Sequence, residues 1–271
     1  MSGAAATRWA DALAGWAIPA EIVEAAPEGP PWRFPPEVFA WTPERSAFER
    51  PMVTPSRQRA LEAVEGGGTV LDVGAGGGRA SLPLVPPASR VTAADASEEL
   101  LAAFADAARR EGVEFETVLG RWPDIASEVG AADLVVCHNV FYNVPDLVAF
   151  AQALTEHARR RVVAEITMDH PASNLNPLWK ALHGIDRPAG PTALDAVAVL
   201  EEMGLDVQWE QWERQLAPSY RSRDDAIAFA RRRLCVGPER DAEIDAILPT
   251  DYERPLRRSV TIWWPGQAGA G

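Results

Sequence analysis

Residues Leu71 to Ala80 read LDVGAGGGRA, and this stretch decides the fold. It continues from a short apolar run, TVLDV at 69–73, which has the length and composition of a buried strand. The run ends in an acid, and glycines follow, so the backbone can turn tightly and approach a bound ligand closely. A strand that ends in such a turn is typical of the ligand-binding edge of an open α/β sheet.

Strand-like and helix-like segments alternate along the chain after this turn. The alternation predicts a parallel α/β sheet, wound right-handed, with helices on both faces. Further strands are expected at 90–95, 113–119, 133–138, 161–167, 205–215 and 257–264, and helices at 97–112, 146–159, 192–204 and after Ser222.

Capping residues mark three of the expected helix starts. Ser97 precedes an amphipathic segment that Gly112 ends. Thr192 and Asp195 have the spacing of a capping box, and Ser222 opens a further helix.

The N-terminal region, residues 1–55, differs from the rest because aromatic residues and prolines are dense in it. Such aromatic density is not typical of a disordered tail. We expect this region to be a cap packed on the domain formed by residues 56–271, with insertions near 168–190 and 217–256. The first insertion fits neither a strand nor a clean helix, and it should lie above the carboxyl ends of the strands.

Composition limits the classes of partner. The net charge is −13, whereas a protein that neutralises phosphates is normally basic, so neither nucleic acid nor an anionic membrane surface is an expected partner. No apolar run is long enough to span a bilayer, and the first residues do not resemble a signal peptide, so we expect a cytoplasmic protein. Cys137 and Cys235 are far apart and have no metal-ligand spacing, and no metal is expected.

The glycine turn can first be compared with a dinucleotide-binding fingerprint, Gly-x-Gly-x-x-Gly. Gly74 and Gly76 fit, but the third glycine position holds Arg79. A side chain there would obstruct the close packing of helix on strand that the third glycine allows. An NAD-dependent oxidoreductase is therefore disfavoured.

In another frame, Asp72, Gly74, Gly76 and Gly78 give an acid followed by alternate glycines. This pattern resembles motif I of the class I S-adenosylmethionine (SAM) dependent methyltransferases. The resemblance implies a Rossmann-like doubly wound sheet, mostly parallel with one antiparallel C-terminal strand. It also implies that Asp72 faces the ammonium side of the methionine arm, and that the turn, including Ala75, contacts the cofactor.

A second acid, Asp95, ends the expected strand at 90–95. A carboxylate in this place accepts hydrogen bonds from vicinal ribose hydroxyls, and a dinucleotide enzyme would use the same position. Asp95 and the adjacent Ala96 are therefore candidate cofactor residues, although they do not by themselves separate the two families.

After the third strand the resemblance weakens. The family often has an acid there that accepts from the adenine amino group, but this sequence has Arg121, which cannot accept. Asp124 or a backbone carbonyl could substitute. Trp122 either covers the adenine face or is an ordinary core tryptophan.

Candidate catalytic residues are His138, Tyr142 and His183. His138 ends the fourth strand beside the expected cofactor pocket, where it lines the methionine arm, acts as a general base, or simply packs. Tyr142 follows it within reach of an acceptor. His170 and His183 flank the first insertion, and His157 is expected to be solvated beside Arg159, Arg160 and Arg161, which we expect to close a helix.

These patterns predict a SAM-dependent methyltransferase that acts on a small molecule and yields S-adenosylhomocysteine. The alternatives are methylation of protein or RNA, a non-catalytic SAM-binding protein, and the less favoured NAD-dependent oxidoreductase. Because the cofactor carries an activated methyl group, methyltransferases need no fixed catalytic triad.

Overall fold

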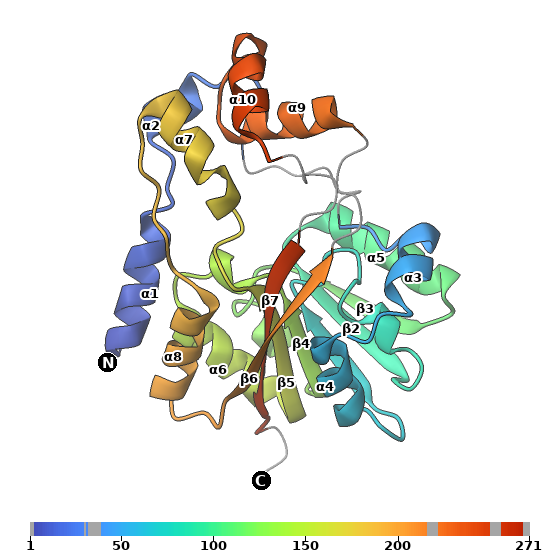
Figure 1. Ribbon diagram of the computed structural model, residues 1–271. Coiled ribbons are helices and arrows are strands. Elements are labelled where there is room, and N and C mark those ends of the chain that lie inside the picture. The colour runs from blue at the N-terminus through green and yellow to red at the C-terminus, as the bar shows by residue number, and fades with distance from the viewer. Residues whose placement is uncertain (1–2, 30, 32–38, 216–221, 250–255, 268–271) are drawn as a thin grey trace.

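The computed structural model describes residues 3–29, 31, 39–215, 222–249 and 256–267 (Figure 1). The strands are β1 (Thr69–Val73), β2 (Arg90–Asp95), β3 (Glu114–Leu119), β4 (Ala132–His138), β5 (Ala158–Thr167), β6 (Gln208–Gln215) and β7 (Leu256–Pro265). The helices are α1 (Ala4–Ala14), α2 (Ala20–Glu24), α3 (Pro43–Glu49), α4 (Pro55–Ala63), α5 (Glu98–Arg110), α6 (Leu147–His157), α7 (Asn176–His183), α8 (Ala193–Glu202), α9 (Arg223–Arg233) and α10 (Asp241–Ile247).

The strands form one sheet in the order β3-β2-β1-β4-β5-β7-β6. Strands β1 to β5 pair in parallel, whereas β7 pairs antiparallel with both β5 and β6. This confirms the predicted doubly wound, mostly parallel sheet with one antiparallel C-terminal strand. Because the chain order reverses between β1 and β4, the carboxyl ends of these strands form the edge where ligands bind in such sheets.

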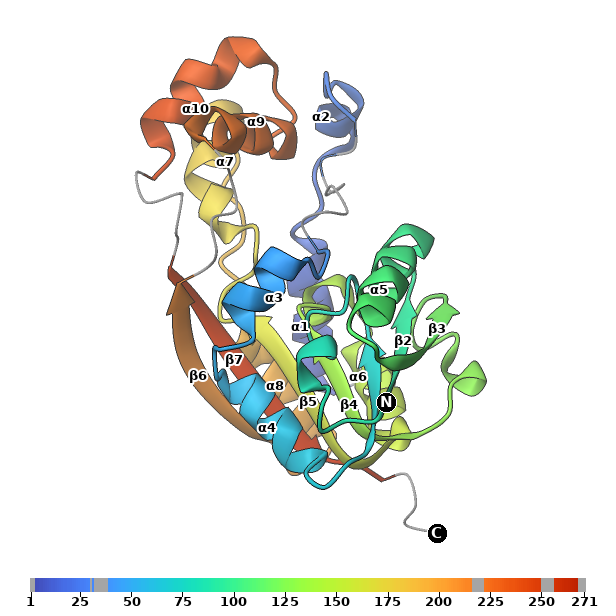
Figure 2. The same cartoon turned by 90° about the vertical axis from the view of Figure 1, so that its right-hand side faces the viewer.

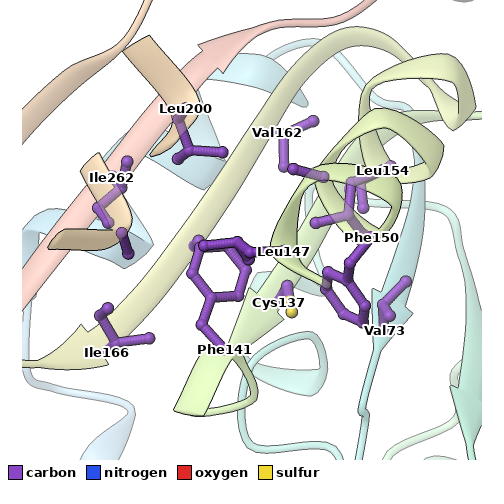
Figure 3. Close-up of a cluster of buried hydrophobic side chains, with 14 of the residues drawn as sticks. Val73, Cys137, Phe141, Leu147, Phe150, Leu154, Val162, Ile166, Leu200 and Ile262 are labelled. Atoms are coloured by element: carbon purple, nitrogen blue, oxygen red, sulfur yellow. The ribbon is translucent and has the colours of Figure 1, made fainter. Parts of the chain in front are cut away.

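Helices cover both faces of the sheet (Figure 2). On one face, α1, α6 and α8 enclose a core that contains Phe141, Phe150 and Ile262 (Figure 3). On the other face, α4 and α5 pack on residues such as Val70, Val136 and Val163. Two apolar faces account for the near-continuous hydrophobic runs of the central strands.

The predicted caps are present. The Ser97 hydroxyl accepts from the Leu100 N–H at 3.3 Å, and Gly112 has φ +68° just after α5. The Asp195 carboxylate accepts from the Thr192 N–H at 2.7 Å at the start of α8. The Ser222 hydroxyl accepts from the Asp225 N–H at 3.1 Å at the start of α9.

Two expectations about local structure were wrong. Residues 168–190 contain the helix α7, which has Pro177 in its first turn and Gly184 with φ +68° after its last. Arg159 to Arg161 do not close a helix, because α6 ends at His157 and these residues begin β5.

A helical unit stands beyond the carboxyl ends of the parallel strands (Figures 1 and 2). Helices α7, α9 and α10 share a buried cluster that contains Leu178, Trp179, Leu234 and Ile244. Ile22 from α2 packs against it, so the N-terminal region contributes to this unit. Part of the proline-rich stretch expected to complete the cap, residues 30 and 32–38, lies outside the described residues.

Within the described part of the chain, the structure has no helix with the length and apolar character needed to cross a membrane.

Candidate functional site

The glycine turn follows β1 at the carboxyl edge of the sheet. Gly74, Gly76 and Gly78 all have positive φ, at +71°, +53° and +91°. At Gly78 a Cβ would lie only 2.6 Å from the Leu82 side chain, whereas at Gly76 it would meet nothing closer than Phe39 at 3.7 Å. Gly78 therefore allows close packing, and Gly76 gives the turn a conformation that side chains rarely adopt.

Asp95 ties the end of β2 to this turn. One carboxylate oxygen accepts from the Gly76 N–H at 2.8 Å, and the other accepts from the Ser97 N–H at 2.9 Å. Each carboxylate oxygen has a further lone pair, so both remain able to accept from a ligand hydroxyl. Asp95 thus holds the turn in shape and presents acceptors at the same edge.

Asp72 lies beneath the turn and is fully buried. Its Oδ2 accepts from the Ser81 hydroxyl at 2.6 Å. Burial raises the pKa of Asp72, the Ser81 hydrogen bonds lower it, and the negative charge of Asp95 also raises it; the net result is a pKa of about 7. A buried carboxyl with such a pKa is poised to ionise when a cation approaches.

The hydrogen bonding of Asp72 indicates whether the site fits SAM. Its Oδ1 is buried without a hydrogen-bond partner among the described residues. An orphaned carboxylate oxygen is costly, and a cationic ammonium group, directly or through water, would compensate it. The methionine arm of SAM carries such a group, so Asp72, Asp95 and the glycine turn fit this cofactor.

Ala75, Ala96, Arg121 and Trp122 lie around the same edge with different exposure. Ala75 is buried and donates its N–H to the Ala94 carbonyl at 3.2 Å, whereas Ala96 and Arg121 are exposed. Trp122 is 7% exposed and belongs to the core cluster. It packs edge-on against His157, with ring centroids 5.0 Å apart, which supports the core interpretation.

The same contact corrects the expectation for His157. Its side chain is half-buried, and its ring nitrogens lie 2.7 Å from the Ala153 carbonyl and 2.9 Å from the Ala126 carbonyl. His157 is therefore a packing residue rather than a solvated one.

His138 ends β4 at the predicted edge, and its side chain is 19% exposed. Its Nδ1 lies 4.0 Å from Oε2 of Glu165 on the neighbouring strand β5. Asn139, the next residue, has φ +61° and donates its N–H to the Glu165 carbonyl at 2.6 Å. The structure thus places His138 beside a buried acid that the sequence did not single out.

Tyr142 is close to this edge, but its hydroxyl points to the backbone. It donates toward the carbonyls of Thr167, at 2.8 Å, and Met168, at 3.2 Å. Burial raises the pKa of Tyr142 above its ordinary value. These contacts favour a structural role, so we do not propose Tyr142 as a base.

His183 does not meet the other candidates. It lies on α7 in the helical unit, where Nε2 is 2.7 Å from the Leu234 carbonyl and the ring packs on Trp179. His170 is closer to the strand ends, where it stacks on Trp16 with centroids 3.8 Å apart. Burial, together with Arg187 and Arg233, lowers the pKa of His170 to about 4, so this ring is neutral.

The N-terminal region contacts the glycine turn directly. Ala40 forms a parallel bridge with Gly77, and a Cβ at Gly77 would lie 2.4 Å from the Phe39 carbonyl oxygen. Arg79, which occupies the third dinucleotide glycine position, forms an ion pair with Glu49 of α3 at 2.6 Å. Arg79 therefore joins the turn to α3.

Three residues at this edge carried no sequence signal that pointed to them: Ser81, Glu49 and Glu165. Each is a common residue type in a segment whose pattern indicates only a strand, helix or turn. Within the described residues, no group of three or more His, Cys, Asp or Glu side chains is arranged to hold a metal ion.

Part of the chain is similar to known methyltransferases. Residues 70–161 match the family model described as "Methyltransferase domain". The ubiquinone biosynthesis O-methyltransferase of Caulobacter vibrioides is 32% identical over 152 residues, which cover 52% of this chain and 59% of that protein. The chain therefore spans somewhat over half the length of this curated relative.

Solved structures share the fold at low sequence identity. The YcgJ protein of Bacillus subtilis superposes with a TM-score of 0.54 at 15% identity, covering 79% of this chain and 99% of that one. A putative methyltransferase of Bacillus halodurans C-125 gives 0.52 at 19% identity, covering 78% and 95%. The matched region contains β1 from Val70 onward, the glycine turn, Asp95 and the end of β4. On this evidence, residues 70–161 carry a methyltransferase domain, in a chain that shares the fold of these solved structures.

Proposed function

We propose that this protein transfers a methyl group from SAM to the hydroxyl group of a small molecule. The observation that carries the proposal is the contact between Asp95 and the glycine turn, with the orphaned Oδ1 of Asp72 behind it. These groups offer acceptors for ribose hydroxyls and a partner for an ammonium group, and the site requires no phosphate.

The residues of the chain then have separate tasks. Asp72 faces the cationic arm, Asp95 accepts from the ribose, and the turn from Gly74 to Gly78 lets the backbone lie against the ligand. When bound, SAM supplies a methyl group already activated on a sulfonium centre. The remaining task of the protein is to hold the acceptor in line with that methyl group and to exclude water.

A small acceptor is favoured by the helical unit and by charge. Helices α7, α9 and α10 stand beyond the strand ends (Figure 2), and we expect them to cover a compact acceptor. The net charge of −13 disfavours RNA. The curated relative is named as an O-methyltransferase, which supports a hydroxyl acceptor.

Incubation with methyl-labelled SAM tests this proposal. The protein is mixed with an extract of its source cell, and the small-molecule and macromolecular fractions are examined separately by mass spectrometry. We expect label in a small molecule, and much less label with Asp95→Ala. Label confined to macromolecules would refute a small acceptor, and bound but untransferred SAM would indicate a non-catalytic binding protein.

A further inference from the structure

A buried glutamate, Glu165, lies beside His138 at the carboxyl edge. The two residues are directly opposite in the register of β4 and β5. The Glu165 side chain is 4% exposed and that of His138 19%, and Nδ1 and Oε2 are 4.0 Å apart. The histidine side chain is thus the more exposed member of the pair as a whole, although its Nε2 is itself buried.

Strand alternation places this pair on the same face as Asp72. Asp72 is aligned with Val136, and His138 follows two residues later on the same strand. Side chains two residues apart in a strand share a face. Cys137, between them, points into the opposite core (Figure 3). His138 therefore shares both the edge and the face of the proposed cofactor site.

A further buried polar residue, Ser259 on β7, lies on the same face of the sheet beyond Glu165. Glu165 is opposite Thr261 on β7, and Ser259 lies two residues away on the same face. Ser259 is 1% exposed, and its hydroxyl has no hydrogen-bond partner among the described residues. A buried hydroxyl of this kind is expected to meet a polar ligand or water. It indicates that polar chemistry continues from Glu165 along this face.

We propose that Glu165 is a positioning residue that holds the proton of His138 on Nδ1, so that Nε2 receives the proton of the acceptor hydroxyl. This inference rests on the proposed function. A carboxylate beside Nδ1 selects the tautomer and stabilises the imidazolium that forms. The separation of 4.0 Å is longer than a hydrogen bond, and such contacts often tighten only when substrate binds.

In the transfer step one bond forms and another breaks. The acceptor oxygen forms a bond to the methyl carbon and gives its proton to Nε2 of His138. The bond between that carbon and sulfur breaks, and its electron pair stays on sulfur, which becomes a neutral thioether. The imidazolium beside the Glu165 carboxylate later releases its proton to solvent.

The tautomer of His138 tests the inference without an acceptor. The chain has only four histidines, so the imidazole signals can be assigned by ¹⁵N NMR with His138→Gln as the reference. We expect the Nδ1–H form in the wild type and a shift toward the Nε2–H form in Glu165→Met. An unchanged tautomer would overturn the inference. If Glu165→Met does not fold, an Nε2–H form in the wild type overturns it and an Nδ1–H form supports it.

Glu210→Met is the matched control. Glu210 on β6 is opposite Thr261, as Glu165 on β5 is from the other side. In contrast to Glu165, its side chain is 41% exposed and forms an ion pair with Arg59 at 3.6 Å. With 3,4-dihydroxybenzoate as the probe acceptor, Glu165→Met should lower kcat about ten- to a hundredfold, with the KM for SAM within about twofold. Glu210→Met should leave both unchanged.

The kinetic outcomes separate the inference from the proposed function. Equal kcat values for Glu165→Met and wild type would overturn the role of Glu165 while leaving methyl transfer intact. If the wild type transfers no methyl group to the probe or to the cell extract, the proposed function itself fails, and the positioning role in that reaction fails with it.

Discussion

Asp72 should make both stability and cofactor binding depend on pH. Its carboxyl is fully buried, and burial raises its pKa from 3.8 to about 7. A carboxyl with a raised pKa keeps its proton more tightly in the folded state than in the unfolded state. The stabilisation by the Asp72 carboxyl is therefore fully present below about pH 3.8, and it is lost as the pH rises from there through about 7. A change of this size corresponds to roughly 4 kcal/mol.

Asp72→Asn removes this titration while keeping the shape and an acceptor for the Ser81 hydroxyl. The free energy of unfolding is measured in urea for both proteins from about pH 5 to about pH 8. From the lower to the higher pH, the free energy of unfolding of the wild type should fall by about 2 to 3 kcal/mol relative to that of the Asn variant. Every other ionisable group is common to the two proteins, so its effect cancels in the difference. Parallel pH profiles would refute the assignment.

Binding of SAM should release a proton from the same carboxyl. An ammonium group near Asp72 favours the ionised form, so the pKa of Asp72 should fall when the cofactor binds. Calorimetry in buffers of different ionisation enthalpy near about pH 6.5 should show this proton release in the wild type. The Asn variant should show much less, and equal release in both proteins would contradict the placement of the methionine arm.

Three further predictions concern the surroundings of Asp72. Asp95→Ala should retain the fold but weaken SAM binding at least about tenfold, because the ribose and the Gly76 and Ser97 N–H groups lose their acceptor. An unchanged affinity for SAM in calorimetry would contradict this role of Asp95. Arg79→Ala should lower the free energy of unfolding by less than about 1 kcal/mol, because the Arg79 side chain is 35% exposed, but it should raise the Kd for SAM. Glu49→Gln should change both quantities by similar amounts, and unequal effects would show that the two residues do not act as a pair. Tyr142→Phe should retain methyl transfer and lose about 1 kcal/mol in urea unfolding, because the hydrogen bonds of its hydroxyl to described residues go to backbone carbonyls. Loss of turnover in a folded variant would restore Tyr142 as a catalytic candidate.

Local patterns were sufficient for the sheet and the glycine turn. A buried strand, an acid and positive-φ glycines are determined by residues adjacent in sequence, and Asp95 follows from the end of the next strand. Helix α7 could also have been found, because Pro177 and Gly184 mark its start and end. It was missed because its buried residues face other insertions rather than the sheet.

The side chains that surround the site depended on tertiary packing. Arg79 argued against a dinucleotide, but its partner Glu49 lies on a different helix, and no periodicity relates the two. Glu165 lies within an apolar strand, and only the register of β4 and β5 brings it to His138. His183 is the opposite case. It follows the end of β5 closely in sequence, but it does not lie at the edge of the sheet where we expect the cofactor.

The most direct test of the account is a calorimetric titration of the purified protein with SAM, compared with NADH. The account predicts saturable binding of one SAM per chain, lost or greatly weakened in Asp95→Ala, and no saturable binding of NADH. Saturable binding of NADH without any binding of SAM would contradict the assignment of the glycine turn and everything built on it.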